Sequence, residues 1–176
     1  MKIVRIIPNN DELLSVYDTS EGISAFRKIF KLWNDTDYLF KFFQANENDL
    51  NITVEDAILK TISDAEKLEE QLHVIAKSSK TQLDSIFKPL HRNDYIRKRF
   101  QHSKAYGRIK KSWLRIYAIR INPELYVVTG GAIKLTKTIQ ERSHTKEQYQ
   151  ILKDVNNHLI KIGFNESDLE QLETEL

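Results

Sequence analysis

Residues 112–138 read SWLRIYAIRINPELYVVTGGAIKLTKT, and the predicted sheet is centred on this stretch. Its two halves are rich in β-branched and aromatic residues, which favour strands, and the NPE segment at 122–124 supplies a turn between them. We therefore predict an antiparallel hairpin formed by 111–121 and 125–136. The adjacent glycines 130 and 131 predict a bulge or a bend inside its second strand.

Outside the hairpin, helical spacing of apolar residues dominates. One strand is predicted at 1–8, where an apolar run ends at Pro8. The predicted helices cover 22–33, a continuation after the break at 34–37, 53–78, 145–163 and a short acidic segment at 167–175. Thr53 with Asp56 is typical of a capping box, and Gly163 is typical of a helix end.

Composition limits the class of protein. A chain of 176 residues with 40% hydrophobic and 30% charged residues suits one globular domain, 1–176. The absence of Cys excludes a disulfide framework, a thiolate metal site and a cysteine nucleophile, and it fits a reducing compartment. Neither a signal peptide nor an apolar run of roughly 20 residues is present, so we expect a cytoplasmic protein without membrane contact.

No cofactor is expected. The sequence contains no GxGxxG, P-loop or GxSxG pattern, and its five His show no HxH or HxxxH spacing that would indicate a metal site.

Positive charge is concentrated in the middle of the chain. Residues 88–142 hold 14 Lys or Arg and 3 acidic residues, whereas 1–87 carry a net charge of −5 and 143–176 a net charge of −4. Aromatic residues that could stack on unpaired bases are interleaved with these cations: Tyr95, Phe100, Tyr106, Trp113, Tyr117 and Tyr126. The pattern favours a polyanion partner over the alternative of a solvated surface with the rings in the core.

The hairpin itself carries candidate phosphate ligands. Alternate residues of a strand share a face, so Arg115 and Tyr117 point the same way. Lys134 lies on the partner strand, and Lys137, Arg142 and His144 follow at its end. These groups could surround one phosphate. The alternative is a sheet edge whose basic side chains face water, and the residues alone leave the two interpretations level.

Three motifs give the chain a family resemblance. FKPL at 87–90, LRIY at 114–117 and AIKLTKT at 132–138 resemble motifs of the RelE/ParE toxin superfamily, most closely its HigB-like branch of type II toxin–antitoxin systems. The resemblance implies an α+β fold with a small twisted antiparallel sheet of about four strands packed by helices. The family core would span 83–160 plus the first strand, with helical elaboration at 22–78 and 164–176.

The resemblance also implies a function, namely a metal-independent endoribonuclease that cuts messenger RNA on the ribosome and is neutralised by an antitoxin. Arg115 and Lys134 would stabilise the charged phosphorane, and His144 or Tyr117 would transfer a proton. The remaining residues expected to bind RNA are Arg97, Lys98, Arg99, Lys104, Arg108, Lys110, Lys111, Lys137 and Arg142.

Two alternatives stay open. Leu135 occupies the position of a second lysine in the family motif, which favours a non-catalytic module that holds nucleic acid or a protein such as gyrase on the same basic face. A third hypothesis is a structural or regulatory protein whose acidic ends fold back on the basic segment.

Overall fold

The fold is described by a computed structural model that covers residues 1–78, 83–90, 100–105, 112–135 and 143–175. The strands are β1 (Lys2–Arg5), β2 (Leu13–Asp18), β3 (Ile23–Ser24), β4 (Phe87–Pro89), β5 (Gln101–Ala105), β6 (Leu114–Asn122), β7 (Leu125–Ile133) and β8 (Glu173–Thr174). The helices are α1 (Ala25–Trp33), α2 (Thr36–Ala45), η1 (Glu47–Asp49), α3 (Val54–Lys77), α4 (Leu83–Ile86), α5 (Ser143–Ile162) and η4 (Glu166–Gln171).

The predicted hairpin is the pair β6 and β7, and both its turn and its irregular second strand are confirmed. Tyr117 pairs with Gly130, whereas its neighbour Ala118 pairs with Val128, so one residue of β7 is bulged beside the glycine pair. A bulge increases the local twist of a strand and bends it. The pairing of β7 with β2 ends at Val128, next to this bulge.

The sheet is larger than expected. Within the described residues it holds eight strands in the order β4-β5-β6-β7-β2-β1-β8, with β3 paired to β2. Two pairings, β2 with β7 and β1 with β8, are parallel. The α+β class is confirmed, but the prediction of a small antiparallel sheet of about four strands is wrong. The unpredicted strands are short or pair with distant partners, so periodicity gives little sign of them.

The long predicted helices are confirmed, and one of the two hydrogen bonds of the predicted capping box forms at the start of α3. Thr53 Oγ1 accepts a hydrogen bond from the Asp56 amide at the start of α3, and Gly163 takes a left-handed conformation, φ +69°, at the end of α5. The predicted acidic helix at 167–175 is wrong, because this segment forms η4 and then β8. Among the described helices, none has the length and apolar character that a bilayer crossing requires.

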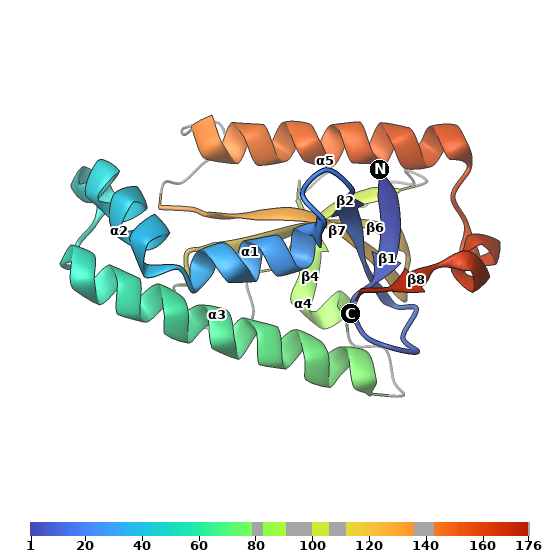
Figure 1. Ribbon diagram of the computed structural model, residues 1–176, viewed down its shortest axis with the longest axis horizontal. Helices are drawn as coiled ribbons and strands as arrows, with labels where there is room; N and C mark the ends of the chain where they lie inside the picture. The colour runs from blue at the N-terminus through green and yellow to red at the C-terminus, as the bar shows by residue number, and fades with distance from the viewer. Residues whose placement is uncertain (79–82, 91–99, 106–111, 136–142, 176) are drawn as a thin grey trace.

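The sheet lies between two helical layers, with α5 on one face and α1, backed by α3, on the other (Figure 1). Side chains of β6 alternate between two cores. Leu114 and Ile116 belong to the core under α1 and α3, whereas Tyr117 and Ile119 belong to the core under α5. Both faces of the central hairpin are thus covered.

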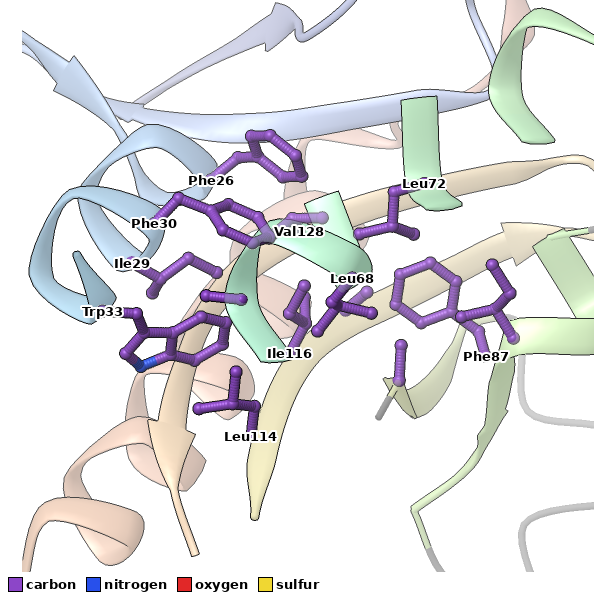
Figure 2. Packing of buried hydrophobic residues seen from close by; sticks show 14 of the residues in the cluster. Phe26, Ile29, Phe30, Trp33, Leu68, Leu72, Phe87, Leu114, Ile116 and Val128 are labelled. Atoms are coloured by element: carbon purple, nitrogen blue, oxygen red, sulfur yellow. The ribbon is translucent and has the colours of Figure 1, made fainter. Parts of the chain in front are cut away.

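Figure 2 shows the first of these cores, in which large side chains of α1 and α3 meet the central strands. Trp33 of α1 and Leu68 of α3 are almost fully buried, as are Leu114 and Ile116 of β6. Burial of each such side chain contributes about 1.5–3 kcal/mol to the free energy of unfolding. This core fixes the position of β6 and hence of the residues on its opposite face.

The acidic C-terminal tail pairs with the edge of the sheet formed by β1. Arg5 Nη2 donates to the carbonyl of Leu169 at 2.6 Å and Nη1 donates to the carbonyl of Leu172, so one guanidinium holds the tail. In the sheet order, β1, β2 and β7 separate this tail from β6. This placement differs from the hypothesis that the tail folds back on the basic residues of the middle segment.

Candidate nucleic-acid interface

Three side chains on the face covered by α5 form what we call the basic cluster: Lys104, Arg115 and Tyr117. The antiparallel register of β5 and β6 places Lys104 directly opposite Tyr117. Arg115 precedes Tyr117 by two residues on the same strand and therefore shares its face. The unbroken pairing of residues 114–117 with β7 confirms the prediction that Arg115 and Tyr117 lie on the same face of the strand.

Lys104 is a cation in an unfavourable setting. Burial lowers the pKa of its ammonium, and the nearby Arg115 guanidinium lowers it further. In the part of the chain that the structure describes, Lys104 has no ion pair with a carboxylate. A bound anion would oppose this shift, because an opposite charge within a few ångströms favours the protonated amine. The cluster therefore has the electrostatics of an anion site.

Tyr117 is the buried member of the cluster, with only 1% of its surface exposed. Its hydroxyl has no hydrogen-bond partner among the described residues. Burial raises the pKa of the phenol to about 12, against the opposing effect of the Arg115 charge. The phenol is protonated at neutral pH and shielded from solvent, so it cannot act as a base there.

The guanidinium of Arg115 is held close to its own strand. Nη1 donates to the carbonyl oxygens of Ser112 and Leu114, both at 2.7 Å. The amide of Lys134 donates to the carbonyl of Trp113 at 2.7 Å, which continues the β6–β7 ladder one residue beyond Ile133. Since Arg115 pairs with Ala132, the register brings Lys134 and Arg115 to the same end of the hairpin as diagonal neighbours.

His144 has a different environment from the one expected for a proton-transfer group. Its Nε2 donates to the carbonyl of Ile133 at 2.8 Å, and its ring meets the ring of Phe42 edge to face at 5.1 Å. The imidazole thus ties the first turn of α5 to β7 and α2, and it lines a cavity between α1 and α5. Of the other predicted RNA ligands, the following lie outside the described residues: Arg97, Lys98, Arg99, Arg108, Lys110, Lys111, Lys137 and Arg142.

Two residues beside the cluster were not among the predicted ligands. His102 lies two residues before Lys104 on β5, and its ring stands edge-on to that of Tyr149 on α5 at 6.4 Å. Lys153 Nζ lies 4.5 Å from the centre of the same Tyr149 ring. Strand alternation within QHSKA at 101–105 places His102 on the same face as Lys104, so the sequence could have indicated His102. The positions of Tyr149 and Lys153 on α5 depend on tertiary packing, which local sequence does not indicate.

Arg120 belongs to the opposite face and is already neutralised. Its guanidinium makes a two-pronged contact with Asp84, at 3.2 and 3.0 Å, and Tyr126 Oη donates to the same carboxylate. The contacts with Asp84 raise the pKa of Arg120, and burial together with the same carboxylate raises the pKa of Tyr126. This ion pair ties α4 to the sheet, so Arg120 is not a candidate phosphate ligand.

Comparisons of the chain with protein-family models, with curated proteins and with solved structures find no match. The chemistry of the site is therefore read from its geometry: two cations and a buried phenol, all donors, at one end of a covered hairpin.

Proposed function

We propose that this chain binds single-stranded RNA and that the basic cluster holds one of its phosphates. The observation that carries the proposal is the pair Lys104 and Arg115, two neighbouring cations of which the first has a pKa lowered by burial. A phosphate oxygen would accept from the Lys104 ammonium and from the Arg115 guanidinium, since both side chains are partly exposed. RNA is the polyanion that the RelE/ParE resemblance implies.

Metal-independent cleavage of messenger RNA is the second candidate, with the ribosome and an antitoxin as further partners. It is favoured by the position of Lys134 beside Arg115 at the end of the hairpin. In this reaction the 2′-oxygen of a ribose attacks the adjacent phosphorus and loses its proton, while the bond to the 5′-oxygen breaks and that oxygen gains a proton. The products are a 2′,3′-cyclic phosphate and a 5′-hydroxyl, and both cations would stabilise the phosphorane between them.

Binding is tested with a fluorescently labelled single-stranded RNA, whose affinity is measured by anisotropy over a range of salt concentrations. Lys104→Gln and Arg115→Gln should each weaken binding and should each reduce the slope of log K against log salt by about 0.7. Lys67→Gln on α3 is the matched control, because it removes the same charge from the opposite side of the sheet. Equal affinities for all three variants and the unchanged chain would refute the proposed site.

Cleavage is tested on the same RNA in the presence of a metal chelator. Products that end in a cyclic phosphate, formed by the unchanged chain and lost in Arg115→Gln, would support the nuclease. Tight, cluster-dependent binding without any product would limit the function to binding. Cleavage that persists in Arg115→Gln would contradict the role given to Arg115.

A further inference from the structure

The sheet opens into a fork between β2 and β7. These strands pair in parallel only over residues 13–15 and 126–128. Beyond that point β2 continues to Asp18 with β1 and β3 as neighbours, whereas β7 continues to Ile133 with β6 as its described neighbour. The fork therefore lies at the carboxyl ends of two parallel strands, where α/β sheets commonly bind ligands.

A cavity of about 290 Å³ fills this fork. Its walls are largely aliphatic: Ile29 and Leu32 of α1 contribute to one side, and Ile151 of α5 contributes to the other. Asp18 and Glu147 also line the cavity, and both are exposed. Among the described residues that line the cavity, Lys28 is the one basic residue apart from His144, and it forms an ion pair with Glu21.

Residues 129–133 of β7 form the floor of the cavity, and on the side away from β6 they have no backbone partner among the described residues. The hydrogen bond from the Lys134 amide to Trp113 fixes which groups face β6. Because outward and inward residues alternate in an antiparallel ladder, the N–H and C=O groups of Gly131 and Ile133 point away from β6 and into the fork. The carbonyl oxygen of Ile133 accepts a hydrogen bond from His144, which agrees with a carbonyl that points away from β6.

We propose that the fork binds an extended peptide segment of a partner protein, which adds a strand to the open edge of β7. Only an extended backbone presents acceptors and donors at the spacing of Gly131 N–H, Gly131 C=O and Ile133 N–H. Successive side chains of the peptide would point alternately towards Ile29 and Leu32 and towards Ile151. The exposed carboxylates of Asp18 and Glu147 at the rim of the cavity favour a peptide that carries a basic residue next to its aliphatic residues.

The chemistry of the cavity favours a peptide over RNA, because its walls are aliphatic and its rim carries two carboxylates that repel phosphates. The chain itself shows the same mode at its other edge, where β8 adds in parallel to β1. The fork is separate from the basic cluster, so this inference does not depend on the proposed function.

The first experiment selects peptides from a phage-displayed library of random short sequences against the intact chain. An enriched peptide is then synthesised, and amide hydrogen exchange is followed with and without it. Binding should slow exchange of the Gly131 and Ile133 amides about tenfold or more, because both N–H groups gain an acceptor. N-methylation of alternate peptide residues should abolish binding, whereas methylation of the residues between them should not.

The second experiment fills the fork. Ile151→Trp should weaken binding of the selected peptide about tenfold or more. Ile160→Trp, on the same helix and 44% exposed, is the matched control and should leave it unchanged. RNA affinity should be the same in both variants, which separates failure of this inference from failure of the proposed function.

Three results would overturn the proposal: no enriched peptide, equal binding of the selected peptide by Ile151→Trp and the unchanged chain, or exchange protection confined to other strands. Protection of Gly131 and Ile133 by a short single-stranded RNA instead of a peptide would assign the fork to a nucleobase and would also overturn it.

Discussion

Gly131 lies directly against the backbone of Arg115: a Cβ atom at this glycine would sit 2.8 Å from the Arg115 carbonyl oxygen. The same atom would lie 3.1 Å from the ring of Trp33 and 3.2 Å from Ile29. The adjacent Gly130 faces the other helical layer, where a Cβ would meet the side-chain oxygen of Gln148. The two glycines thus allow both helical layers to pack closely against β7, the strand that lines the fork.

We expect Gly131→Ala to lower the free energy of unfolding by about 1–3 kcal/mol, because backbone and two packed core side chains would have to move. Gly130→Ala is the matched control and should cost less, since only the flexible end of Gln148 must swing away. Chemical denaturation of both variants measures the difference. Equal losses would contradict the close approach at Gly131.

Tyr117→Phe should leave the free energy of unfolding unchanged or raise it by up to about 1 kcal/mol. The substitution removes a buried hydroxyl that has no partner among the described residues, and such a group carries an uncompensated desolvation cost. RNA affinity should not change, because the hydroxyl is shielded from solvent and from a bound phosphate. A variant that is clearly less stable would show that this hydroxyl has a partner in the folded chain.

The raised pKa of Tyr117 makes stability depend on pH in the alkaline range. Between pH 10 and about 12 the folded phenol keeps its proton while the unfolded one loses it, so the unfolded state binds fewer protons and stability falls as pH rises. The contribution is fully present below pH 10. Tyr117→Phe should reduce the slope of unfolding free energy against pH in this window by up to about 1.4 kcal/mol per pH unit. Parallel curves for the two proteins would contradict the assignment.

Arg5→Met should release the C-terminal tail. The variant loses a partly buried guanidinium that bonds two tail carbonyls and Asp11, so we expect stability to fall by about 1.5–3 kcal/mol. Exchange of the Glu175 amide, which donates to the Arg5 carbonyl, should accelerate. RNA affinity should not rise, because the tail lies at the β1 edge and not on the basic cluster. A clear rise would support the hypothesis of an acidic mask.

Local patterns predicted the elements whose signal lies within one segment. The hairpin, its bulge at the glycine pair, the cap at Thr53 and the end of α5 at Gly163 all follow from residues a few positions apart. Strand alternation likewise predicted that Arg115 and Tyr117 share a face. The size of the sheet did not follow, because β2 pairs with a strand more than a hundred residues away and β8 has only two residues.

The amino-acid pattern alone predicted the long amphipathic helices and the central hairpin, and it located the positive charge between 88 and 142. These properties depend on periodicity, turn chemistry and counting, which are local. Three features emerge from the folded chain and not from local patterns: Lys104 stands opposite Tyr117, His144 binds the end of β7, and β2 and β7 separate around a cavity. Each depends on which distant segments pack together, and that choice is made by burial of the whole core.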